Sequence, residues 1–171
     1  MPAFIHPATL DTAALLAECD VRRQRRSGPG GQHRNKVETA VVIVHRPTGV
    51  RGEGSETRSQ ADNRSNAIQR LRVKLALAVR SPEFAIEQCP STLWRSRLRG
   101  EQITVSAQHT DFPILLAEAL DCIAAYQYDF PLAAEKLGCS SSQLIKLLKL
   151  EFEALEQVNE QRKLLDLRPL R

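Results

Sequence analysis

Residues 26–45 read RSGPGGQHRNKVETAVVIVH, and they contain two opposite backbone signals. Three glycines and one proline fall within positions 28–31. Such a run excludes both helix and strand, because proline lacks an amide donor and glycine permits positive φ angles and close approach of the backbone. Residues 38–45 are β-branched and almost wholly apolar, which predicts a strand. The sequence therefore predicts a bare loop, with a charged strand at 20–26 leading into it.

The residues after this strand predict a hairpin and then a helix. Residues 46–49 (RPTG) fit a type I turn, with proline second and glycine fourth, and residues 50–57 would be the antiparallel partner strand. Ser59 and Asp62 have the spacing of a capping box, which opens a helix. Its expected buried stripe consists of four apolar residues at helical spacing: Ile68, Leu71, Leu75 and Val79.

The last third of the sequence predicts three helices. Asp111 would cap a helix at 112–126, and a proline begins a second at 131–137 that stops at Gly138. Ser140 would cap a third helix, continuing to about Leu165. Residues 133–147 resemble a helix-turn-helix. That pair of helices could serve packing alone, contact RNA or bind DNA, and the residues expected on the outside of its second helix are Ser141, Ser142, Gln143, Lys146 and Lys149.

Other segments give weaker signals. Residues 9–19 predict a short helix with Thr9 or Thr12 as its N-cap, and residues 102–107 alternate like one more strand. Trp94, the single tryptophan, could anchor two elements or stack on a base, and the anchor is the more ordinary role.

These signals together predict an α+β fold. We expect a small antiparallel or mixed sheet with one packed helix and a protruding loop, followed by a C-terminal helical module that resembles a helix-turn-helix. The expected domains are residues 1–108, which contain the loop, and residues 109–171.

The charge distribution points to a polyanionic partner. Residues 21–80 contain 14 basic and 4 acidic residues, whereas the segments on either side are each net negative by three charges. A basic segment of this strength indicates nucleic acid contact. Residues 1–20 contain no basic residue and so match no targeting segment, and no apolar run approaches the roughly 20 residues of a membrane span. We expect a cytoplasmic monomer with no membrane contact.

Several kinds of site are excluded by spacing. No glycine has P-loop spacing before Lys36, and His33 stands where a dinucleotide fingerprint needs its last glycine. Ser27 has no histidine and carboxylate partners at the spacing of a known triad. The four cysteines form no C-x-x-C pair, which predicts free buried thiols, and we expect no metal site and no cofactor.

A glycine loop of this kind offers backbone N–H groups without side-chain hindrance. Such donors can bind negative charge that develops in a reaction, and one donor is worth ~10²–10³ in rate. The ordinary alternative is the tip of a glycine-rich hairpin. Spacing alone leaves both interpretations open.

The loop and its flanks resemble the GGQ domain of class I peptide chain release factors and their ribosome-rescue relatives. The core of the resemblance is residues 26–36 (RSGPGGQHRNK), followed by TAV at 39–41. Three further pieces agree at the expected distances: His45 to Gly49 (HRPTG), Arg58 to Gln60 (RSQ), and Asn63-Arg64 before a basic helix. The resemblance covers residues 15–80, and Arg34 departs from it by replacing the usual valine or isoleucine.

The resemblance implies hydrolysis of the peptidyl-tRNA ester in the large ribosomal subunit, with residues 1–108 as the catalytic domain. Gly30 and Gly31 would let the loop enter the peptidyl transferase centre, and the backbone N–H of Gln32 would bind the oxyanion while water attacks. The implied partners are large-subunit ribosomal RNA and peptidyl-tRNA, and a glutamine methyltransferase acting on Gln32 is a further candidate. The expected RNA-binding residues are Arg26, Ser27, His33, Arg34, Asn35, Lys36, Arg58 and Arg64.

The sequence around this resemblance favours codon-independent rescue of stalled ribosomes. Only 25 residues precede Arg26, too few for the decoding domain that stop-codon release factors place there. Residues 160–171 have a net charge of +2, a weak version of the basic tail of some rescue hydrolases. Two alternatives stay open: a non-catalytic ribosome- or RNA-binding factor that keeps the fold, and a DNA-binding regulator that uses the C-terminal helices.

Overall fold

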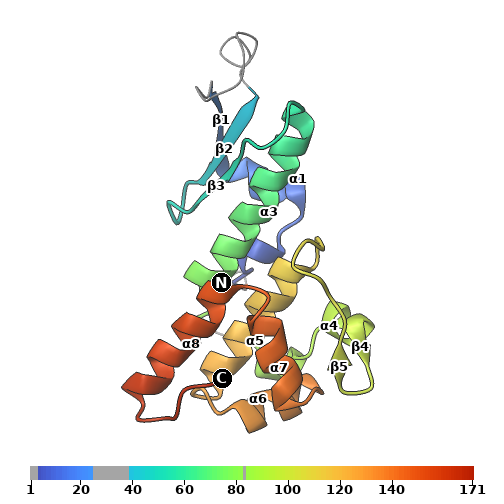
Figure 1. The fold of residues 1–171 in the computed structure, drawn as a ribbon, viewed down its shortest axis with the longest axis vertical. Helices are drawn as coiled ribbons and strands as arrows, with labels where there is room; N and C mark the ends of the chain where they lie inside the picture. The colour runs from blue at the N-terminus through green and yellow to red at the C-terminus, as the bar shows by residue number, and fades with distance from the viewer. Residues whose placement is uncertain (1–3, 25–38, 83) are drawn as a thin grey trace. The chain divides into compact units, whose positions relative to one another are not determined.

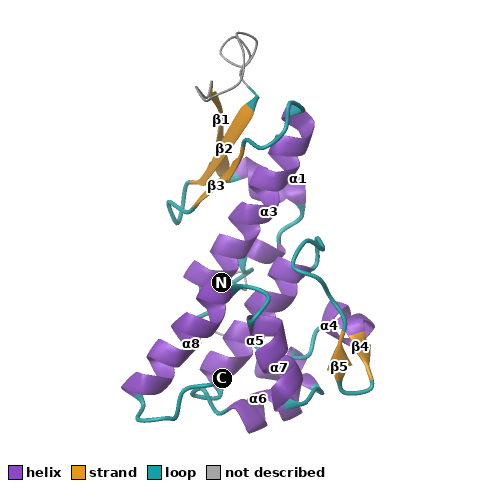
Figure 2. Ribbon diagram, in the orientation of Figure 1, coloured by secondary structure: helices purple, strands orange, loops and turns teal. Residues whose placement is uncertain are grey.

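The computed structural model describes residues 4–24, 39–82 and 84–171 of the 171-residue chain. The chain forms two compact units. The N-terminal unit spans Pro7–Ala78, and the C-terminal unit combines Val79–Arg171 with Met1–His6. Their elements combine small antiparallel sheets with helices, which confirms the predicted α+β class (Figures 1 and 2). The domain boundary expected after residue 108 stays a prediction.

A three-stranded antiparallel sheet forms the core of the N-terminal unit. Its strands β1 (Cys19–Gln24), β2 (Ala40–His45) and β3 (Arg51–Gly54) lie in sequence order, so that β2 is central. The strands predicted at 20–26, 38–45 and 50–57 are therefore confirmed, with shorter described bounds. In β2, five of the six residues are buried, as its apolar sequence requires.

The β2–β3 turn is wider than the predicted type I turn. Gly49 N–H donates to the carbonyl of His45 at 2.8 Å, and His45 N–H donates to Val50 at 2.9 Å. Gly49 has φ +71°, and this left-handed conformation is the physical reason that glycine occupies the position.

Helix α3 (Gln60–Ala78) packs on β2 and β3 (Figure 1). Leu71 and Leu75 are fully buried as predicted, while Ile68 and Val79 are only partly covered. The fully buried row instead repeats every four residues: Asn63, Ala67, Leu71 and Leu75.

Two glycines of β3 allow this close packing. A Cβ added to Gly52 would collide with the carbonyl oxygen of Ala67, and one added to Gly54 would collide with the carbonyl oxygen of Asn63. The helix backbone therefore lies directly on the strand, at a distance that no side chain on β3 would permit.

The first elements of the N-terminal unit are the short 3-10 helix η1 (Pro7–Thr9) and helix α1 (Thr12–Ala17). Asp11 caps α1 by accepting from Ala14 N–H at 2.8 Å, so the predicted caps Thr9 and Thr12 are both wrong. Buried Arg72 of α3 donates to the carbonyl of Ala8 at 2.7 Å and ties η1 to the helix.

The C-terminal unit is mainly helical. Its elements are η2 (Ile86–Gln88), α4 (Thr92–Arg97), β4 (Leu98–Arg99), β5 (Gln102–Ile103), α5 (Phe112–Ala125), α6 (Phe130–Leu137), α7 (Ser141–Leu148) and α8 (Phe152–Leu164). Trp94 is completely buried and donates to the carbonyl of Leu137 at 2.8 Å, which confirms the anchor. The four cysteines are buried free thiols, as predicted.

Three details of this unit differ from the sequence analysis. The strand expected at 102–107 is only two residues long. Asp111 stands at the N-cap position of α5, but its carboxylate binds Arg97 instead of the helix amides. The long helix expected from Ser140 to Leu165 is two helices, because the chain turns between α7 and α8 and leaves Phe152 70% exposed.

Candidate functional site

Strands β1 and β2 hold the two ends of residues 25–39, which we call the GGQ segment, side by side. Their antiparallel register pairs Gln24 with Ala40, and residues 25–39 connect these two partners. Residues 25–38 lie outside the described part of the chain. The assignments of Gly30, Gly31, Gln32, Arg26, Ser27, His33, Arg34, Asn35 and Lys36 therefore stay predictions.

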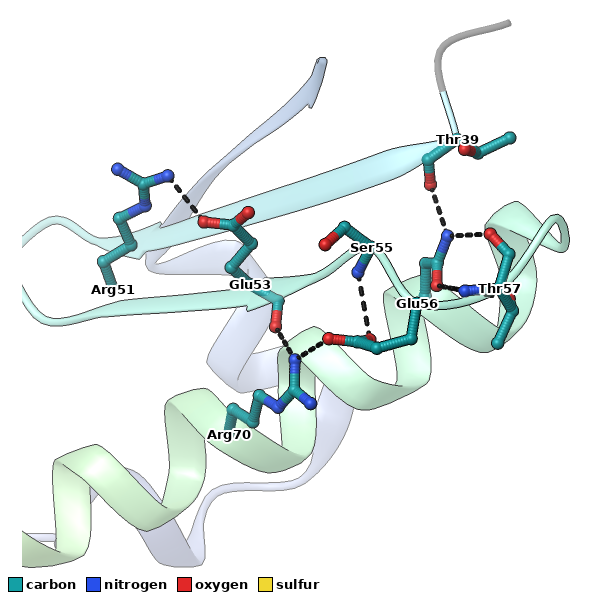
Figure 3. A network of polar contacts seen from close by, with 8 residues as sticks. Thr39, Arg51, Glu53, Ser55, Glu56, Thr57 and Arg70 are labelled. Atoms are coloured by element: carbon teal, nitrogen blue, oxygen red, sulfur yellow. Dashed lines mark hydrogen bonds and ion pairs between the residues drawn. The ribbon is translucent and has the colours of Figure 1, made fainter. Parts of the chain in front are cut away.

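Asn63 fastens the point where the chain returns from this segment (Figure 3). Its side-chain amide donates to the carbonyl oxygens of Thr39 at 2.8 Å and Thr57 at 2.9 Å. Its Oδ1 accepts from the backbone N–H and the hydroxyl of Thr57, at 3.0 and 3.2 Å. Every polar group of this completely buried side chain is thus paired, which favours a single position for the start of β2.

The two predicted RNA-binding residues that the structure describes lie beside this hydrogen-bonded cluster. Arg58 and Arg64 are exposed, and neither forms an ion pair with another described side chain. Ser59, which lies between them in the sequence, accepts from Asp62 N–H at 3.2 Å and so caps α3 as predicted. The reciprocal bond of a capping box is replaced, because Ser59 N–H donates to the hydroxyl of Thr57 at 3.2 Å. Both guanidinium groups are therefore available to an anion near the start of α3.

A second polar contact tightens the loop between β3 and α3. Arg70 donates to the carbonyl of Glu53 at 2.8 Å and to the carboxylate of Glu56 at 2.5 Å (Figure 3). Ser55 N–H also donates to Glu56, at 3.0 Å. The hydrogen bond from Arg70 is the main cause that lowers the pKa of Glu56 to about 2.

The HRPTG motif lies at the other end of β2 and has structural contacts. Nε2 of His45 lies 2.9 Å from Oε2 of Glu18, and its Nδ1 lies 2.7 Å from Oγ1 of Thr48. Arg46 donates to the carbonyl oxygens of Ala17 and Cys19 at 2.5 and 2.9 Å. This part of the resemblance thus serves to join α1, β1 and the turn.

The role of Asn63 was not predicted from the sequence. Asn63 and Arg64 both belong to the resemblance, but a function was expected only for the arginine. A usable signal was present, because Asn63 stands four residues before Ala67, eight before Leu71 and twelve before Leu75. An asparagine on a buried helical row needs partners for all its polar atoms, and a backbone segment is the usual source.

The sequence model of the "RF-1 domain" matches residues 14–108, which is more than half of the chain. The chain belongs to the RF-1 domain family. The match includes all three strands of the N-terminal unit, helix α3 and the GGQ segment. The resemblance stated from the motifs is thereby confirmed.

Curated relatives of the RF-1 domain include proteins from bacteria and a mammal. The chain is 44% identical over 77 residues to "Peptide chain release factor 1" of Xylella fastidiosa and 41% identical over 76 residues to "Peptide chain release factor 2" of Paramagnetospirillum magneticum. It is 38% identical over 82 residues to "Peptide chain release factor 1-like, mitochondrial" of Rattus norvegicus. These matches cover 45%, 43% and 42% of this chain but only 21%, 20% and 22% of the relatives.

Two further observations concern the described residues alone. None of their helices combines the length and the apolar character that a bilayer span requires. Within the same ranges, no three histidine, cysteine, aspartate or glutamate side chains gather closely enough to hold a metal ion.

Proposed function

We propose that this RF-1 domain protein hydrolyses the ester bond of peptidyl-tRNA on the ribosome. The observation that carries the proposal is the GPGGQ sequence at 28–32, located within the RF-1 match and between the register partners Gln24 and Ala40. A segment whose two ends are paired in a sheet can be presented as a unit to a narrow site. The family relationship supports a release-factor type of reaction.

In the proposed reaction, water attacks the ester carbonyl that joins the peptide to tRNA. The carbon–oxygen bond to the tRNA ribose then breaks, which yields a free peptide carboxyl group and a tRNA hydroxyl group. The backbone N–H of Gln32 binds the oxygen that is negatively charged in the transition state, and Gly30 and Gly31 allow the backbone to approach. The Gln32 side chain helps to admit water and to exclude larger nucleophiles.

The basic residues of the N-terminal unit supply the ribosomal contact in this proposal. Arg58 and Arg64, both exposed, would neutralise phosphates of large-subunit RNA beside the base of the segment. Six residues of the segment itself would add contacts: Arg26, Ser27, His33, Arg34, Asn35 and Lys36. We retain residues 1–108 as the proposed catalytic domain, and Gln32 as the proposed substrate of a methyltransferase.

The finer proposal is that release needs no stop codon. Purified protein should release peptide from ribosomes stalled on an mRNA without a stop codon. Adding a stop codon to the decoding site should leave the rate unchanged. If the protein released peptide only when a stop codon was present, codon independence would be contradicted, but the proposed ester hydrolysis would not.

Substitution of the glycines tests the catalytic role. Gly31→Ala should reduce peptide release by at least ~10²-fold, the effect of one lost oxyanion donor, because a Cβ hinders the approach of the backbone. Ribosome binding by the same variant should stay within about twofold of wild type. A wild-type protein that binds ribosomes but releases no peptide would instead favour the non-catalytic factor.

A further inference from the structure

The C-terminal unit contains a helix-turn-helix with a β-hairpin packed beside it. Helix α6 ends at Gly138 in the left-handed conformation (φ +69°), and α7 begins after Ser140, whose hydroxyl accepts from Gln143 N–H at 3.4 Å. Helices α6 and α7 both pack on α5, and their buried residues, each at most 2% exposed, include Ala133, Ala134, Leu137, Leu144 and Leu147. The predicted helix-turn-helix is therefore present as a folded motif.

The hairpin of β4 and β5 is fixed to this motif by direct contacts. Ser140 N–H at the α6–α7 turn donates to the carbonyl of Glu101 at 3.4 Å, and β5 packs against α7. Trp94, in the helix that precedes β4, donates to Leu137 at the end of α6. A helix-turn-helix with an adjoining hairpin presents two elements to the same ligand, and Figure 1 shows β4 and β5 beside α7.

Four exposed cations lie on these elements: Arg95 on α4, Arg99 on β4, and Lys146 and Lys149 on and directly after α7. We call them the wing surface. None of them forms an ion pair with a described carboxylate, whereas nearby Arg97 is bound to Asp111 at 2.5 Å. Ser142 of α7 adds an exposed hydroxyl. Uncompensated cations beside an exposed hydroxyl are suited to phosphate oxygens.

We infer that the wing surface binds the sugar–phosphate backbone of duplex RNA. The exposed polar side chains of α7 are the hydroxyl of Ser142 and one lysine, Lys146, whereas Gln143, the first-turn residue suited to bidentate recognition of a base, is only partly exposed. Contacts of this kind follow backbone shape and 2′-hydroxyl groups, which is how duplex RNA is recognised. The choice of RNA over DNA rests on the proposed function, because the particle involved there is built of RNA.

The test measures binding of the full-length protein to a short RNA duplex of mixed sequence over a series of salt concentrations. The double variant Lys146→Glu with Lys149→Glu should bind about tenfold or more weakly. The slope of log K against log salt should fall in magnitude by about two, one for each phosphate contact removed. Glu101→Lys, at the exposed tip of the hairpin, should bind more tightly than wild type.

The matched control is Lys163→Glu with Arg168→Glu, which changes net charge equally at exposed positions in and after α8. An equal loss in this control, or no loss in the Lys146/Lys149 variant, would overturn the inference. The inference would also be overturned if the Lys146/Lys149 variant lost more affinity for a DNA duplex of the same sequence than for the RNA duplex. Peptide release by wild-type protein is assayed separately, so failure of the proposed function and failure of this inference give different results.

Discussion

At the scale of single residues, Asn63 ties helix α3 to Thr39, where the chain returns from the GGQ segment. In Asn63→Asp, the replaced amide no longer donates to the carbonyls of Thr39 and Thr57, and a carboxylate faces both. A buried carbonyl left without a donor costs about 1–3 kcal/mol, so we expect urea unfolding to show a loss of roughly 2–5 kcal/mol. Peptide release should fall at temperatures where the variant is still folded.

Arg64 supplies the control for this experiment. Because its side chain is exposed, Arg64→Ala should change the free energy of unfolding by less than about 0.5 kcal/mol. If Asn63→Asp were as stable as Arg64→Ala, the hydrogen bonds of Asn63 would not matter for holding Thr39.

The Glu56–Arg70 contact predicts a pH dependence. The folded-state pKa of Glu56 is about 2, below the ordinary glutamate value. The ionised carboxylate therefore contributes fully to the free energy of unfolding above about pH 4.3. That contribution is lost as the pH falls towards 2, because the protonated carboxyl no longer pairs with Arg70. In Glu56→Gln, the free energy of unfolding should depend less on pH over this window. The difference should not exceed about 1 kcal/mol, since both side chains are about half exposed. If Glu56→Gln lost as much stability as wild type between about pH 4.3 and pH 2, the Glu56–Arg70 contact would not be the source of this pH dependence.

At the scale of elements, the packing of α3 on β3 depends on two small residues. Gly54→Ala places a methyl group against the carbonyl oxygen of Asn63, and the backbone cannot move away without breaking the Asn63 contacts. We expect a loss of about 1–3 kcal/mol, typical of overpacking, measured by thermal unfolding. Gly100→Asn is the control, because nothing lies near that glycine and asparagine tolerates its positive φ.

Elements with a single strong period could be predicted from the sequence. The apolar run of β2 predicted the strand, and the helical spacing of Ile68, Leu71, Leu75 and Val79 predicted the helix, although only Leu71 and Leu75 of that stripe are fully buried. The break between α7 and α8 could not be predicted, because no glycine or proline marks residues 149–151 and the spacing of Leu148 and Phe152 continues a helical stripe. Only the burial of the side chains distinguishes one long helix from two, because Phe152 is exposed and is not part of a buried helical stripe.

The candidate site was only partly predictable, for the same physical reason. The GGQ motif and the basic residues could be found because their chemistry is local in sequence. The link from Asn63 to Thr39 crosses 24 positions, and no local pattern specifies which carbonyl a buried amide will bind.

At the scale of the whole molecule, the proposed function assigns binding and chemistry to different residues, so the two should separate in kinetics. The double variant Arg58→Glu with Arg64→Glu removes two exposed cations outside the GGQ segment. We expect the protein concentration for half-maximal peptide release to rise about tenfold or more, with little change in the maximal rate. Gly31→Ala should show the opposite pattern. A lower maximal rate in the arginine variant would place these residues in the reaction itself.

The burial of Trp94 provides a spectroscopic probe of one half of the chain. It is the single tryptophan of the protein, and its indole is enclosed by the C-terminal unit with its N–H bonded to Leu137. Its emission should therefore shift to the red only when that unit opens, whereas circular dichroism at short wavelengths sums over every helix. Following both signals through one denaturant titration would show whether the three-stranded sheet and the helical half of the protein unfold together or in succession.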